Sequence, residues 1–257
     1  MSKYFESFPK VLYLYGNEIT PVATQNLTKF SNLINEIGDQ ISAYIEYEIR
    51  DFERPDTLSQ RLYGNSTYDW TFFLMNDTLR EQGWPLPLQD VYKLATENLY
   101  RDWTLKLGLT TADSAAEFAN LYPAGTDVLL NGNPLVVKRK DLSVGEITVY
   151  SKNWSIDSDF SSFTMISYAD GTNAKAVTTV KEIFGTNYYK NDSDKPIDFF
   201  FGTYDDDIED YVPDVTKVPV TNLDHLIAEN DKLKTIRIIK KELIETVTGQ
   251  FRQRIGN

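Results

Sequence analysis

The sequence contains no cysteine and one histidine, His225. Without cysteine the chain cannot form disulfides, thiolate metal sites or a cysteine nucleophile. A histidine metal site or a Ser-His triad needs further partners, and the only titratable neighbour of His225 is Asp224. No glycine-rich phosphate loop is present either. The sequence therefore predicts a protein that is not an enzyme and that has no metal, cofactor or small-molecule substrate.

Basic residues are outnumbered, with 26 Lys and Arg against 38 Asp and Glu, a net charge of −12. Binding to nucleic-acid phosphates requires clustered Lys and Arg, and the patch Lys138-Arg139-Lys140 is too small for that. No apolar run approaches the roughly 18 residues that cross a bilayer. The first residues also lack the apolar core of a secretory signal. We expect no nucleic-acid or membrane partner and synthesis in a cytoplasm.

Much of the negative charge lies in one segment. Residues 191–214 contain nine acidic residues against the single Lys195. The spacing of Asp205, Asp206, Asp207 and Glu209 lacks the alternation and central glycine of a calcium loop. A solvated acidic loop is the better interpretation.

Apolar periodicity predicts a mixed set of elements. Helical spacing indicates helices over 21–37, from Pro55, over 67–76 and over 89–106, and alternation indicates a strand over 41–49. Short β-prone runs follow, at 126–130, 134–139, 146–151, 160–169 and 176–183, separated by turn residues such as Asn131-Gly132. Apolar residues spaced by three or four then predict one long helix from about Asn222 to the C-terminus.

The segment 44–84 contains the most specific pattern. Its order is a strand, a turn with Asp56-Thr57-Leu58, a helix ending at Tyr63-Gly64, and a second helix. This order resembles the LysM module, a strand–helix–helix–strand unit. The residues that carry the resemblance are Arg54, Pro55, Leu58, Tyr63, Gly64, Asn65, Tyr68, Trp70 and Asn76. Arg54-Pro55 replaces the glycine that the module usually has before its aspartate.

The resemblance implies an α+β fold. We expect a LysM-like βααβ core with flanking helices, an inserted small antiparallel β module and a long C-terminal helix. The corresponding segments are an N-terminal arm and helix (1–40), the LysM-like core (41–107), the β module (108–190), an acidic linker (191–221) and the C-terminal helix (222–257). Physical reasoning agrees locally: Pro55 suits a first helical turn, Gly64 suits a left-handed helix end, and Asn76 can close the second helix by bonding its free carbonyls. We expect Trp70 to pack in the core.

A narrower resemblance adds two further stretches. With Arg54-Pro55 in place of the glycine, and with Gly83-Trp84 beyond, this segment is similar to the wedge-joining baseplate protein of T-even-type contractile-tailed bacteriophages. The run 230–241 resembles the closing helix of that family, and Tyr4-Phe5 with Phe8-Pro9 resembles its opening. The resemblance does not extend to residues from about 108 to 220, which look like an insertion.

The family resemblance implies a structural virion protein. It would clamp neighbouring wedges during assembly of the tail baseplate, contact other wedge proteins in several copies per virion, and be assembled in the host bacterial cytoplasm. The alternative is a LysM-type protein that binds peptidoglycan or a related glycan. A glycosidase built on Asp51, Glu53 and Asp56 is a weaker reading, because acids in such a turn usually cap helices or face solvent.

The predicted assembly surface combines the two ends of the chain. An aromatic arm over residues 4–15, expected to be extended because Pro9 lies in its middle, would present Tyr4, Phe5 and Phe8. The C-terminal helix would present an apolar stripe with basic residues around it. The residues of that stripe are Leu233, Ile236, Ile239, Leu243, Val247 and Phe251.

Overall fold

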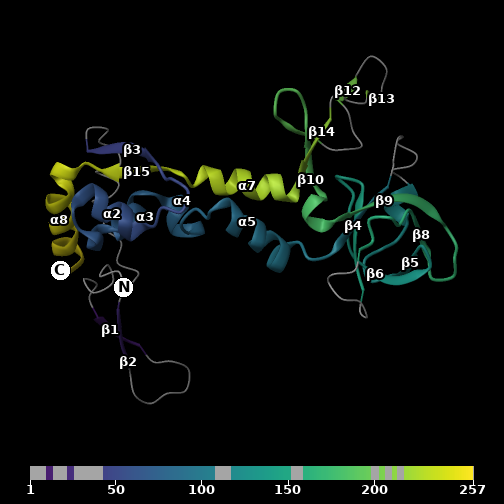
Figure 1. The fold of residues 1–257 in the computed structure, drawn as a ribbon, viewed down its shortest axis with the longest axis horizontal. Coiled ribbons are helices and arrows are strands. Elements are labelled where there is room, and N and C mark those ends of the chain that lie inside the picture. Colours follow the sequence, from purple (N-terminus) through teal and green to yellow (C-terminus); the bar gives the residue numbers. More distant parts are fainter. Residues whose placement is uncertain are drawn as a thin grey trace. The chain divides into compact units, whose positions relative to one another are not determined.

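The computed structural model describes residues 10–13, 22–25, 43–107, 117–151, 159–197, 203–205, 210–212 and 217–256. The chain forms two compact units. Unit 1 consists of Met1–Pro87 and Glu229–Asn257, and unit 2 consists of Leu88–Ala228. Unit 1 is therefore discontinuous, and unit 2 is inserted between its two parts (Figure 1). These units follow contacts in space and do not coincide with the five consecutive segments expected from the sequence.

Unit 1 contains a two-stranded antiparallel sheet of β3 (Tyr44–Glu48) and β15 (Thr235–Ile239). The register pairs Tyr44 with Ile239 and Glu48 with Thr235. β15 reads Thr-Ile-Arg-Ile-Ile, and such β-branched residues favour a pleated strand. The sheet thus joins two stretches from opposite ends of the sequence.

Short helices complete unit 1. Helix α2 (Pro55–Tyr63) has Pro55 in its first turn and ends at Gly64, whose φ of 75° is left-handed. Both features confirm what the sequence indicated, because proline lacks an N–H that the first turn does not need and glycine tolerates positive φ. The remaining helices are η2 (Ser66–Tyr68), α3 (Trp70–Met75), α4 (Asp77–Gln82), η5 (Lys241–Leu243) and α8 (Ile244–Gly256).

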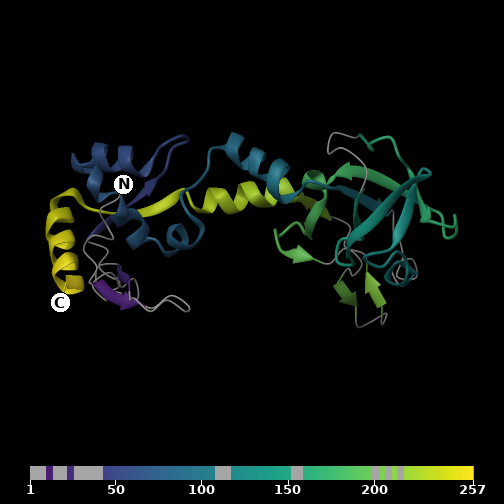
Figure 2. The ribbon, with the colours of Figure 1, turned by 90° about the horizontal axis from the view of Figure 1, so that it is seen from below.

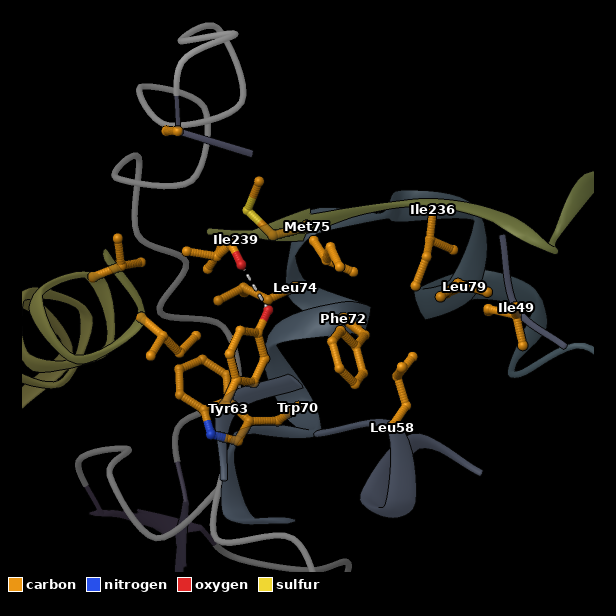
Figure 3. Close-up of a cluster of buried hydrophobic side chains, with 14 of the residues drawn as sticks. Ile49, Leu58, Tyr63, Trp70, Phe72, Leu74, Met75, Leu79, Ile236 and Ile239 are labelled. Atoms are coloured by element: carbon orange, nitrogen blue, oxygen red, sulfur yellow. Dashed lines mark hydrogen bonds between the residues drawn. The ribbon is translucent and has the colours of Figure 1, made fainter. Parts of the chain in front are cut away.

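The core of unit 1 draws on both parts of the chain (Figure 3). Leu58 and Phe72 are fully buried, and the indole ring of Trp70 lies 5.1 Å from the ring of Phe251 on α8. Ile236 and Ile239 of β15 are buried in the same cluster. Because residues 58–79 and 233–251 share one core, neither part can bury its apolar side chains without the other.

A separate hairpin consists of β1 (Lys10–Tyr13) and β2 (Val22–Gln25). The extended conformation expected around the N-terminal arm therefore holds for residues 10–13. The helix expected over 21–37 is wrong for residues 22–25, where Val22 and Thr24 suit a strand. The other residues of 26–37 lie outside the described ones.

Unit 2 is built on a closed barrel of six antiparallel strands (Figure 2). Its interior includes Leu105, Leu130, Ile147 and Ile166, all fully buried. The turn at Asn131-Gly132, which the sequence indicated, has positive φ at both residues, as a tight hairpin requires. Around the barrel the strands are β4 (Trp103–Leu107), β7 (Glu146–Tyr150), β6 (Asn133–Asp141), β5 (Asp127–Leu130), β8 (Met165–Tyr168) and β9 (Lys175–Lys181).

Shorter helices and strands precede and follow the barrel strands along the sequence. Asn222 at the start of α7 (Asn222–Lys232) donates its side-chain amide to the carbonyl of Glu182 at 2.7 Å, which ties α7 to η4 (Glu182–Phe184). A Cβ at Gly185 would lie 3.0 Å from that carbonyl, so only glycine fits there without movement. These elements are α5 (Leu88–Leu94), the π-helix η3 (Ala95–Leu99), η4 (Glu182–Phe184), β10 (Thr186–Lys190), β11 (Pro196–Ile197), β12 (Thr203–Asp205), β13 (Asp210–Val212), β14 (Val218–Thr221) and α7 (Asn222–Lys232).

The structure corrects the expected fold class. A LysM-like βααβ core over 41–107 followed by a small β module and a long C-terminal helix is wrong. The inserted part is a closed six-stranded barrel, and its first strand, β4, lies where a helix over 89–106 was expected. The C-terminal part is α7, then strand β15, then α8. Apolar spacing of three or four predicted a helix, but the β-branched run in β15 and the alternation in β4 outweighed it.

We predict that Trp70→Ala lowers the free energy of unfolding of unit 1 by about 3–5 kcal/mol, because it leaves a cavity beside Phe251. Phe52→Ala is the control, since Phe52 is 74% exposed, and it should change stability by less than about 0.5 kcal/mol. Urea unfolding of both variants, followed by tryptophan fluorescence and circular dichroism, measures the difference. Equal midpoints for the two variants would contradict the packing described here.

Candidate functional site

All nine residues of the predicted LysM-like motif lie in unit 1, on or next to α2, η2 and α3. Two of them, Tyr63 and Asn76, reach across to β15. The others shape the chain locally. Asn65, for example, accepts a hydrogen bond from the Thr67 amide at 2.9 Å and so begins η2. The motif therefore acts in the structure as a set of packing, capping and strand-pairing residues.

The carboxamide of Asn76 pairs with the backbone of β15. Its oxygen accepts the N–H of Arg237 at 2.8 Å, and its nitrogen donates to the carbonyl of the same residue at 2.9 Å. The nitrogen also donates to the carbonyl of Phe72 at 2.8 Å, which closes α3 as the sequence suggested. One amide thus ends a helix and takes the place of a neighbouring strand beside Arg237.

The hydroxyl of Tyr63 has a similar role two residues further along β15, at Ile239. It donates to the carbonyl of Ile239 at 2.9 Å (Figure 3), and burial raises the pKa of this phenol well above its ordinary value. Residues 237 and 239 of β15 point their backbone groups away from β3, since antiparallel pairs alternate. Tyr63 and Asn76 therefore close the outer edge of β15 at these two residues.

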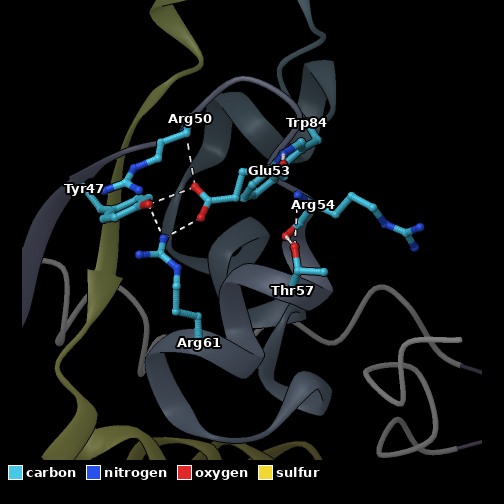
Figure 4. A network of polar contacts seen from close by, with 7 residues as sticks. All are labelled: Tyr47, Arg50, Glu53, Arg54, Thr57, Arg61 and Trp84. Carbon is cyan, nitrogen blue, oxygen red and sulfur yellow. Dashed lines mark hydrogen bonds and ion pairs between the residues drawn. The ribbon is translucent and has the colours of Figure 1, made fainter.

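A polar network lies between β3 and α2 (Figure 4). The Glu53 carboxylate accepts hydrogen bonds from the Tyr47 hydroxyl at 2.8 Å and from the Arg50 amide at 3.2 Å, and it forms an ion pair with Arg61. Arg61 also donates to the Tyr47 oxygen. The indole N–H of Trp84 donates to the Glu53 carbonyl at 2.7 Å.

This network shifts the ionisation of its members. Burial acts to raise the pKa of the Glu53 carboxyl, but the hydrogen bonds from Tyr47, the Arg50 amide and Arg61 outweigh it and lower the pKa. Burial and the hydrogen bond to Glu53 raise the pKa of the Tyr47 phenol. Glu53 is thus held as a carboxylate, which suits an ion pair and not a proton donor.

The other acids considered for catalysis have separate partners. Asp51 lies 3.2 Å from the Lys234 amine, and Asp56 lies 3.1 Å from the Arg54 guanidinium. Each of the three carboxylates is therefore neutralised by a different cation. Within the described part of the chain, no group of three or more His, Asp or Glu side chains is arranged to hold a metal. His225 packs edge-on against the ring of Tyr188, with centroids 6.0 Å apart.

The residues predicted for the assembly surface are placed differently from the expectation. Leu243 is 37% exposed, and the side chains of the remaining members of the stripe are buried in the core of unit 1. The stripe is absent because strand β15 interrupts the helix that would have formed it. The buried members are Leu233, Ile236, Ile239, Val247 and Phe251. Tyr4, Phe5 and Phe8 lie outside the described residues.

Sequence reasoning missed a buried charge in unit 2. Glu146 on β7 lies 3.2 Å from the Lys106 amine, and it accepts the N–H of Thr186 at 2.9 Å. Burial raises the pKa of the Glu146 carboxyl, although these partners oppose the shift. Lys106 and Glu146 face each other in the β4–β7 register. The two charged residues are neighbours only because β4 pairs with β7 in this register, so the sequence alone did not indicate their ion pair.

No protein-family model matches the chain, and a search of curated proteins finds no relative. Among the described residues, no helix is long and apolar enough to cross a membrane.

We predict that Asn76→Ala lowers the free energy of unfolding by about 2–4 kcal/mol, because three hydrogen bonds of about 0.5–1.5 kcal/mol each are lost. Asn76→Asp is the matched variant. It keeps the acceptor for the Arg237 amide but sets a carboxylate oxygen against the carbonyls of Phe72 and Arg237, so it should be at least as destabilising as Asn76→Ala. Urea unfolding measures both. If the two variants were as stable as the parent, the amide would not be closing the strand edge.

We predict that the stability contributed by Glu53 is present above the ordinary pKa of glutamic acid, about 4.3, and is lost as the pH falls through its lowered folded pKa. The difference in unfolding free energy between the parent and Glu53→Gln should therefore shrink from pH 7 to pH 3. Glu146→Gln is the control of opposite sign. Because the folded pKa of Glu146 is raised, the unfolding free energy of the parent should rise relative to that of Glu146→Gln as the pH falls. The same sign for both variants would exclude the assigned shifts.

Proposed function

We propose that the protein is a structural, non-enzymatic subunit of a contractile bacteriophage tail, which clamps neighbouring wedges of the baseplate. The proposal starts from the resemblance of residues 44–84 and 230–241 to the wedge-joining family. Its main structural support is that these two stretches, far apart in sequence, fold into the same compact unit. Asn76 of the first stretch pairs with Arg237 of the second, 161 residues later.

The organisation of the chain supports the same proposal. The region that the resemblance does not cover, about 108–220, falls within unit 2, which has its own barrel and its own core. The chain leaves and re-enters unit 1 at one place, where the Leu86 amide donates to the Asn230 side chain at 2.7 Å and the Asn230 amide donates back to the Leu86 carbonyl at 2.9 Å. A family core with an independent insertion is the simplest account of this pattern.

In this proposal the partners are other wedge proteins, and several copies occupy each virion. The protein is made in the host bacterial cytoplasm and ends in the tail baseplate. A clamp acts through packing and charge complementarity, and it requires a rigid unit. The shared core, the closed edge of β15 and the Glu53–Arg61 network give unit 1 such rigidity.

We predict that phage lacking this chain accumulate complete but unjoined wedges. Sedimentation and electron microscopy of infected-cell extracts would detect these wedges, and supplying the parent chain in trans should restore closed baseplates. Closed, functional baseplates without the chain would contradict the proposal. A pull-down with insoluble peptidoglycan is the companion experiment, since specific retention would favour the glycan-binding alternative.

A further inference from the structure

The two edges of the sheet in unit 1 differ. The hydrogen bonds from the Ile49 amide to the Lys234 carbonyl (2.8 Å) and from the Lys240 amide to the Ala43 carbonyl (3.1 Å) fix the phase of the β3–β15 ladder. Residues 43, 45, 47 and 49 therefore pair with β15. In an antiparallel strand the alternate residues point their backbone groups the other way. The N–H and C=O groups of 44, 46 and 48 thus form the outer edge of β3.

Within the described residues this outer edge pairs with no further strand, whereas the outer edge of β15 is covered at residues 237 and 239. Asn76 satisfies both outward backbone groups of Arg237, and Tyr63 satisfies the outward carbonyl of Ile239. Across the described ranges of the chain, the sheet has only two strands, and no hydrogen bond reaches the outward backbone groups of β3. An open edge is a template for another strand unless charge or shape blocks it. The side chains beside the edge therefore decide which strand it can accept.

Those side chains carry negative charge on one face and an apolar group on the other. Glu46 and Glu48 are exposed, and neither belongs to an ion pair with any other described residue. Arg237, which faces Glu46 across the ladder, lies instead over the Tyr44 ring, 5.0 Å from its centroid. Ile45 points to the opposite face of the strand and is 47% exposed, although its partner Ile238 is buried. An added strand would cover Ile45.

We infer that the outer edge of β3 binds an extended segment of a partner protein as a third strand. The segment carries Lys or Arg at alternate positions, beside Glu46 and Glu48, and an apolar residue between them that covers Ile45. Backbone hydrogen bonds supply affinity, and the alternating side chains supply specificity. A second copy of β3 does not fit, because it would place glutamates against glutamates. This inference goes beyond the proposed function and does not depend on it.

The experiment uses the full chain and a fluorescent seven-residue peptide of alternating Lys and Val, blocked at both ends. Fluorescence anisotropy should show binding at least ten times tighter than that of the matching Glu–Val peptide. Glu46→Pro should weaken Lys–Val binding at least tenfold, because proline removes an outward N–H. It should leave the β3–β15 ladder intact, since that N–H takes no part in it. Tyr47→Pro is the contrasting variant, because Tyr47 pairs with β15 and its loss should unfold the sheet.

Hydrogen exchange gives an independent readout. In the free chain the amides of Tyr44, Glu46 and Glu48 should exchange faster than those of Ile45 and Tyr47, and the peptide should slow the first three. If Glu46→Pro fails to fold, the double variant Glu46→Lys, Glu48→Lys replaces it and should prefer the Glu–Val peptide.

Four results would overturn the inference. Equal affinity for the two peptides would show that Glu46 and Glu48 do not select a basic strand. Binding that Glu46→Pro leaves unchanged would be attraction to the acidic chain as a whole. Protection of the three outward amides in the free monomer would mean that the chain fills its own edge. A dimer in sedimentation that Glu46→Pro dissociates would identify a second copy as the occupant.

Discussion

The pairing of β3 with β15 is the constraint on which unit 1 depends. It joins residues near the start of the chain to residues near its end, and the apolar face of the sheet anchors α2, α3 and α8. Closing so long a loop costs entropy, but the cost grows only logarithmically with loop length. A folded insertion also removes most of the freedom that the loop would otherwise lose. The mutual hydrogen bonds of Leu86 and Asn230 fix the two ends of the insertion beside each other.

The sequence predicted the local features that a few residues determine. Pro55 begins α2, Gly64 ends it and Asn131-Gly132 turns the β5–β6 hairpin, because proline and glycine restrict or permit backbone angles regardless of what surrounds them. Strands β5 to β9 were also indicated by their alternation. Trp70 was expected in the core, and it is buried. These predictions needed no information on long-range contacts.

The errors came from segments that long-range contacts decide. The apolar residues from Leu233 to Phe251 fit a helical stripe, but Ile236, Ile238 and Ile239 form a strand because β3 offers them a ladder. Likewise, the end of the expected helix over 89–106 forms β4, which completes the barrel between β7 and β9. The sequence indicated that Asn76 ends a helix, but it did not indicate the two hydrogen bonds of Asn76 to Arg237. Those bonds could be predicted only if the strand beside Asn76 were known, and a single sequence does not show which strand that is.

The same interactions that hold unit 1 together also limit how it can meet a partner. Most of the apolar side chains of 233–251 are consumed in its own core, so its adhesion must come from other groups. Asn76 and Tyr63 remove one sheet edge from use, and the Glu53–Arg61 pair neutralises charge at the start of α2. Among the described residues, the part of the sheet that can still pair with a partner is the acidic outer edge of β3, with Ile45 beside it. Backbone hydrogen bonding, which every partner can supply, then becomes selective through the glutamates that flank it.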